Sequence, residues 1–185
     1  LFSFALNFSS KSESSKAGTD QTLKEALKEA FQSRSYNFLT LAFFVCGFHV
    51  TFVAVHLPAF IEDEKLPFWV GGWALALIGL FNVIGTIYFG YLGDRLSKKY
   101  LLTLLYSLRG ILFFVFIFVP KTELTVLVFA CILGILWLST VPLTSGIITV
   151  VFGPYYMSML YGIAFLSHQL GSFLGSWLGG RLFDI

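Results

Sequence analysis

Three side chains that can carry or exchange a proton occupy similar depths in three apolar segments of this sequence. Arg109 lies nine residues after Tyr100, which opens one such segment, so in a helix it lies about 13 Å along it. His49 and His168 each lie twelve residues into their own segments. A guanidinium presents a planar fork of donors that suits a carboxylate, and an imidazole exchanges protons near neutral pH. The three residues therefore predict one polar site.

Each of these residues also has a purely structural interpretation. Backbone carbonyls or a neighbouring helix can satisfy a buried arginine, and a lone histidine is often a hydrogen-bonded helix contact. Gln169 and Asn82 are candidates for completing the polar lining. No metal or other cofactor is expected, because the nearest potential ligand pair, Cys46 and His49, lacks a third member. The sequence has no nucleophile elbow, P-loop or zinc-protease pattern, so we do not expect an enzyme.

The composition identifies the protein class. Hydrophobic residues make up 57% of the chain and charged residues only 12%, about half the charged fraction of a soluble domain. This balance predicts an integral membrane protein whose main partner is the lipid bilayer. The net charge of +2 is too small to indicate nucleic-acid binding. Cys46 and Cys131 both lie within apolar runs, where we expect small core residues and no disulfide.

The apolar segments divide the chain into a bundle and a preceding linker. A bilayer core about 30 Å thick needs roughly 20 apolar residues as a helix. Residues 1–8 read as the end of a preceding membrane helix, residues 9–36 as a linker and residues 37–185 as the bundle. Within the linker, Thr22 and Glu25 have capping-box spacing at the start of an amphipathic helix, which lies on the membrane surface or packs on a neighbouring segment. The predicted spans are 37–61, 68–92, 100–119, 124–152 and 156–184.

Basic residues orient these spans in the membrane. Eight of the twelve lysines and arginines fall on the side that carries the linker and the loop after the second span. By the positive-inside rule, that side is cytoplasmic. The predicted location is a plasma (inner) membrane, crossed several times. The eight are Lys11, Lys16, Lys24, Lys28, Arg34, Arg95, Lys98 and Lys99.

Two further patterns concern movement and packing. Pro142 removes a backbone hydrogen bond from the fourth span, and nearby hydroxyl residues can partner the freed groups, so we expect a bend that is either static or a hinge. Gly171, Gly175 and Gly179 recur every four residues in the last span and predict a flat stripe for close helix packing.

The loop after the second span resembles a signature of the major facilitator superfamily. Gly90, Leu92, Asp94, Arg95 and the pair Lys98 and Lys99 match its G-x-L-x-D-R pattern followed by basic residues, although Ser97 stands where glycine is usual. Together with the preceding linker, this identifies the chain as similar to the C-terminal half of a twelve-helix transporter. The segments P-L-T-S-G and G-S-F-L-G-S-W-L-G-G-R-L-F-D resemble its monocarboxylate-porter and oxalate-formate branch.

The resemblance implies an all-α fold, namely five complete transmembrane helices of a six-helix bundle, preceded by a cytoplasmic linker with an amphipathic helix. It also implies that six N-terminal helices and a last helix are missing. The implied mechanism is alternating access, with an organic anion paired to Arg109 and a coupled proton on His49 or His168. The Gly90–Lys99 loop and Pro142 would take part in gating. The alternatives are an exporter of neutral or cationic compounds and a non-transporting scaffold or sensor.

Overall fold

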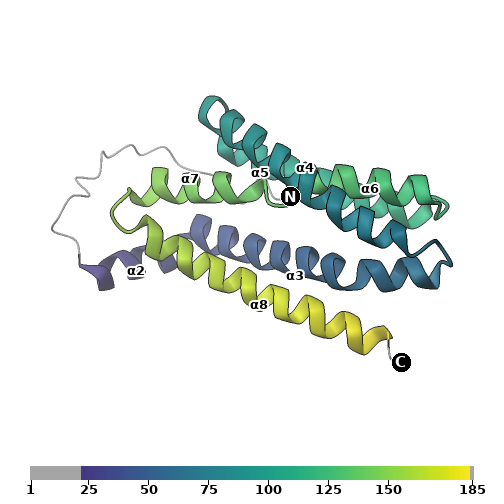
Figure 1. Cartoon of the computed structure of the whole chain (residues 1–185). Helices are drawn as coiled ribbons and strands as arrows, with labels where there is room; N and C mark the ends of the chain where they lie inside the picture. The colour runs from purple at the N-terminus through teal and green to yellow at the C-terminus, as the bar shows by residue number, and fades with distance from the viewer. Residues whose placement is uncertain (1–21, 184–185) are drawn as a thin grey trace.

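The computed structural model describes residues 22–183, which form seven α-helices and no strand within that range. The predicted end of a preceding membrane helix at residues 1–8 and most of the linker lie outside the described residues. Figure 1 shows the long helices running roughly parallel, with short turns at both ends of the bundle. The helices are α2 (Leu23–Gln32), α3 (Arg34–Asp63), α4 (Trp69–Arg95), α5 (Lys98–Phe118), α6 (Glu123–Leu136), α7 (Thr140–Phe152) and α8 (Met157–Phe183).

Helix α2 begins at the capping box that its sequence predicts. The Thr22 hydroxyl accepts a hydrogen bond from the Glu25 amide, and the Glu25 carboxylate accepts one from the Thr22 amide at 2.9 Å. These bonds satisfy two backbone donors that a helix start otherwise leaves open. Ala26 and Ala30 are buried where α2 packs on α3. Ser33 then ends α2 and starts α3.

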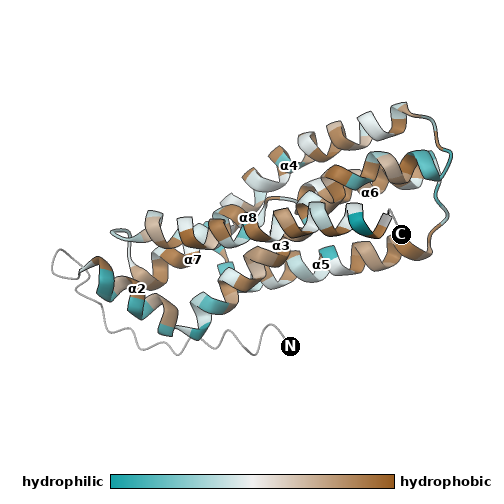
Figure 2. Cartoon of the chain, turned by 90° about the horizontal axis from the view of Figure 1, so that it is seen from below, coloured by the Kyte–Doolittle hydropathy of each residue, from teal (hydrophilic) through white to brown (hydrophobic). Residues whose placement is uncertain are grey.

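Four helical segments are long and apolar enough to cross a membrane. They are α3, α4, α5 and the combined stretch Glu123–Phe152, and hydrophobic residues dominate along them (Figure 2). Helix α8 has 27 residues and occupies the place of the fifth predicted span, but it is not among the four. A count of five spans therefore remains a prediction.

The fourth span is two helices rather than one bent helix. Helix α6 ends at Leu136 and α7 begins at Thr140, so the interruption lies before Pro142. The reason is local: proline has no amide hydrogen and its ring clashes with the carbonyl four residues earlier, here that of Leu138. Pro142 lies in the first turn of α7, where a missing donor is harmless.

Helix α8 packs closely along α3. A Cβ atom added at Gly171 would collide with the Phe44 carbonyl oxygen, and one at Gly175 with that of Phe48. Gly179 lies in the same way against the His56 ring. The glycine stripe thus lets the backbones of α3 and α8 approach more closely than residues with a Cβ atom would allow.

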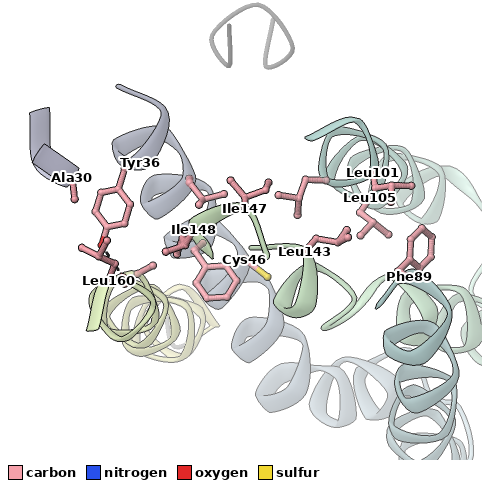
Figure 3. Close-up of a cluster of buried hydrophobic side chains, with 14 of the residues drawn as sticks. Ala30, Tyr36, Cys46, Phe89, Leu101, Leu105, Leu143, Ile147, Ile148 and Leu160 are labelled. Atoms are coloured by element: carbon pink, nitrogen blue, oxygen red, sulfur yellow. Dashed lines mark hydrogen bonds between the residues drawn. The ribbon is translucent and has the colours of Figure 1, made fainter. Parts of the chain in front are cut away.

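The buried side chains form two hydrophobic clusters that meet near the middle of the bundle. The first cluster includes Tyr36, Cys46, Leu143 and Leu160 (Figure 3). The second contains residues from the C-terminal half of α3 together with residues of α4 and α6. The boundary between them falls at the helix break, because Leu136 belongs to the first cluster and Trp137 to the second. The polar residues described next lie at this boundary.

Candidate functional site

Arg109 of α5 caps the broken end of α6. Its side chain is 2% exposed, and Nη2 donates hydrogen bonds to the carbonyl oxygens of Leu136 and, at 2.6 Å, Trp137. The last carbonyls of a helix have no partner within the helix, and in a bilayer no water replaces one. A single nitrogen of the guanidinium supplies both bonds.

Asn82 of α4 and Ser139 satisfy the remaining groups at the break. The Asn82 side-chain oxygen accepts a hydrogen bond from the Leu138 amide at 3.0 Å. The Ser139 hydroxyl donates to the Ile135 carbonyl at 2.5 Å. Side chains from α4, α5 and the break itself therefore hold the interrupted backbone, and two predicted substrate contacts, Arg109 and Asn82, have backbone partners.

A thiol lies on the other side of the guanidinium. Arg109 Nη1 is 3.2 Å from Cys46 Sγ of α3, and Thr140 Oγ1 of α7 is 3.7 Å from the same sulfur. The Tyr106 ring lies under the guanidinium, with 5.6 Å between the Arg109 Cζ atom and the ring centroid. Arg109 thus links α3, α5 and the α6–α7 break through a single charged group.

His168 of α8 closes this polar cluster. A Cβ atom added at Gly47, next to Cys46, would collide with the His168 carbonyl oxygen. The His168 Nδ1 atom lies 3.2 Å from the Gln169 side-chain oxygen, and the ring stacks on Phe165. The buried Nε2 atom has no hydrogen-bond partner. Gln169 itself is exposed.

His49 lies one turn beyond Cys46 on α3. Its ring packs against Phe113 of α5 at 5.5 Å, and its buried Nδ1 atom has no hydrogen-bond partner. Arg109 acts electrostatically on both His49 and His168. The structure therefore brings together the three side chains whose common depth the sequence indicated.

The charge of Arg109 has no carboxylate partner among the described residues. Across residues 22–183, every aspartate and glutamate lies in α2 or at the end of a long helix. Carbonyl oxygens and a thiol stabilise a guanidinium but do not supply a full opposing charge. A buried cation without a counter-ion favours negative charge nearby and opposes a second cation.

The segment predicted as the Gly90–Lys99 loop is instead the end of α4, a two-residue turn at Leu96 and Ser97, and the start of α5, and this α4–α5 corner packs on α7. Lys98 Nζ donates to the Gly93 carbonyl at 2.7 Å and lies 3.8 Å from the Asp94 carboxylate, which is 82% exposed. A Cβ atom added at Gly146 of α7 would collide with the Lys98 side chain. The guanidinium of Arg95 lies 4.5 Å above the Tyr91 ring. A Cβ atom added at Gly90 would lie 3.8 Å from Pro142, so the ends of α4 and α5 pack together with α7.

Cys46 and Thr140 are the cluster residues that sequence reasoning missed as site members. Cys46 reads as a small core residue and Thr140 as a local partner for the bend. A signal was available on α3, because Cys46 and His49 are three residues apart and so share a helix face. The pairing of Cys46 with Arg109 spans 63 positions, which no local pattern reveals.

Comparison with known proteins identifies a family that the chain matches. Residues 1–176 match the family described as the Major Facilitator Superfamily. The chain is also 28% identical over 160 residues to the uncharacterized MFS-type transporter YcxA of Bacillus subtilis (strain 168), an alignment that covers 83% of this chain and 38% of that protein. No solved structure matches the chain significantly.

Proposed function

The chain belongs to the major facilitator superfamily, and on this premise we propose that it is part of a secondary transporter that moves a small organic anion by alternating access. The chain spans 38% of the length of its relative, so the rest of the transporter would supply the other wall of the pathway. In this mechanism two helical bundles rock about a site near the bilayer midplane.

The observation that carries the anion assignment is the uncompensated charge of Arg109. Nη2 donates to the Leu136 and Trp137 carbonyls and Nη1 to Cys46, while the buried Nε atom has no partner. Because both terminal nitrogens are engaged, direct pairing with substrate is not the main role of Arg109 in our proposal. We assign it instead to two tasks: it holds the α6–α7 break, and its charge attracts an anion to that depth. Asn82 shares only the first task.

Direct contact with the solute falls to the histidine side of the cluster. His168 carries a free Nε2 atom and His49 a free Nδ1 atom, and Gln169 adds an amide beside His168. A neutral imidazole can accept the coupled proton and then donate a hydrogen bond to a carboxylate. We propose His168 as the proton carrier, with the bound anion offsetting the second positive charge that Arg109 opposes.

The α4–α5 corner and α7 form the gating part of the proposal. Gly90, Asp94, Arg95, Lys98 and Lys99 lie at the end that we assign to the cytoplasm of a plasma (inner) membrane. Asp94 is exposed and so is available to accept hydrogen bonds from the other bundle. Because Lys98 packs across Gly146, opening of this corner would move α7 relative to α6 at the break before Pro142.

The test is a transport assay on the full-length protein in proteoliposomes. Uptake of labelled monocarboxylates and other small organic acids is compared with uptake of organic cations, while a dye reports luminal pH in lightly buffered vesicles. We expect anion uptake with a coupled pH change, and we expect His168→Gln to lose the pH change while retaining anion exchange.

His56→Gln is the matched control, because His56 Nε2 lies 3.1 Å from the Ser176 carbonyl, outside the cluster, and the variant should keep the pH change. Uptake of cations that organic acids do not inhibit would overturn the anion assignment. A folded protein that moves neither class would favour the scaffold or sensor alternative.

A further inference from the structure

Helix α2 carries an apolar ridge that the bundle covers only in part, with Leu27 partly buried against the core. Leu23 and Phe31 are each 54% exposed, whereas Ala26 and Ala30 on the adjoining face are buried against α3. Leu23, Leu27 and Phe31 are spaced by four residues, so they line one side of the helix. The helix thus has two apolar strips: the alanine strip is buried, and the ridge remains largely exposed at Leu23 and Phe31.

The attachment of α2 to α3 fixes where this ridge can lie. Ser33 alone separates the two helices; its amide donates to the Glu29 and Ala30 carbonyls, and its hydroxyl accepts from the Tyr36 amide. The Asn37 side chain donates to the Phe31 carbonyl at 2.8 Å. Because α3 is a candidate membrane span, α2 is held at the membrane–water boundary.

Charges flank the ridge on one side only. At 100° per residue, Lys24 and Lys28 follow directly on the Phe31 side of the ridge, whereas Glu25 and Glu29 lie on the far side of the helix. Both lysines are exposed. An apolar strip bordered by lysines is the pattern of a helix that lies in the headgroup region of a membrane.

We infer that α2 is a docking surface for anionic lipid, with Leu23, Leu27 and Phe31 in the acyl boundary and Lys24 and Lys28 on headgroup phosphates. The electrostatic gain is about fivefold in lipid affinity for each lysine at such a surface. A protein partner, including the rest of the transporter, would instead bury the whole ridge and pair the lysines with carboxylates, which is the alternative that the experiment below excludes or supports. The inference does not depend on the transported solute.

Contacts from the ridge lead to the end of the fourth span. The Phe31 ring meets Tyr36 edge-on at 6.0 Å, and Tyr36 meets Phe152 of α7 in the same way at 5.6 Å. The Tyr36 hydroxyl donates to the Leu160 carbonyl of α8 at 2.8 Å, as Figure 3 shows. Lipid bound to α2 would therefore be connected, through Phe31 and Tyr36, to the residues on both sides of the turn that joins α7 to α8.

The experiment measures the depth of the ridge in a membrane. A nitroxide is attached to Leu23→Cys in the full-length protein, which is reconstituted in phosphatidylcholine with increasing phosphatidylglycerol. Collisions with oxygen and with a water-soluble nickel complex report the depth. We expect the nitroxide to move into the bilayer as phosphatidylglycerol rises, and we expect Lys28→Gln to raise the half-saturating phosphatidylglycerol content about fivefold.

The control variants isolate the charge. K24R/K28R should retain the response and K24Q/K28Q should lose it, with unfolding temperatures in detergent equal to that of the parent. A nitroxide shielded from both reagents would show that protein covers the ridge. One that is open to the nickel complex in every vesicle, or equally deep in phosphatidylcholine alone, would also overturn the inference.

Discussion

Replacing Arg109 should destabilise the fold before it affects any substrate. The guanidinium donates to two buried carbonyls, of Leu136 and Trp137, and a hydrogen bond from a charged donor contributes about 1.5 to 3 kcal/mol. Arg109→Lys keeps the charge but reaches one carbonyl at a time, so we expect a loss of about 2 kcal/mol. Arg109→Gln loses the charge as well, which removes some desolvation cost, and we expect a loss of about 3 kcal/mol.

The assay is thermal unfolding of the purified full-length protein in detergent. About 2 kcal/mol corresponds to roughly 4 to 8 °C for a domain of this size. Arg34→Gln is the matched control, because Arg34 is exposed at the start of α3 and its loss should change stability by less than about 0.5 kcal/mol. Unfolding temperatures of both Arg109 variants within about 1 °C of the parent would refute the reasoning that this residue caps the break.

Three further outcomes are expected. Asn82→Leu leaves the Leu138 amide unpaired and should cost about 1 to 3 kcal/mol, whereas Asn82→Asp keeps an acceptor; equal unfolding temperatures would contradict this. Gly171→Ala should separate α3 from α8 and lower the unfolding temperature. Gly162→Ala is the control, because a Cβ atom there meets open space, and it should be neutral or stabilising. An equal fall in unfolding temperature for both variants would contradict the packing of α8 on α3. Hydrogen bonds to Thr22 lower the pKa of Glu25 below its usual 4.5. The cap therefore stabilises α2 above pH 4.5, and this stabilisation is lost as the pH falls through the lowered pKa. Amide exchange in α2 should become faster below pH 4.5, and an unchanged exchange rate there would contradict the prediction.

The long apolar helices were predictable from sequence, four of them as candidate membrane spans, and the partners of their polar residues were not. An apolar run of about 20 residues has few alternatives to a membrane helix, and the α2 start follows from one side chain reaching three residues along. The bend was expected at Pro142 but lies at 137–139, because the proline ring clashes with the carbonyl four residues earlier, and the Leu138 carbonyl accepts instead from the Val141 amide. Arg109 donates to the carbonyls at the end of α6. This contact joins residues far apart in the sequence, and the spacing of apolar residues does not predict it.

The broken fourth span has an electrostatic consequence. A continuous helix has dipole ends only at the two membrane surfaces, but α6 and α7 each end inside the bilayer, with about −0.5 charge at the C-terminus of α6 and about +0.5 at the N-terminus of α7. Arg109 more than offsets the first, and Ser139 makes no side-chain cap on the second. The two dipole ends are separated only by residues 137–139 and sum to about zero. The positive charge at the middle of this bundle therefore comes from Arg109, and neutralising Arg109 would remove it.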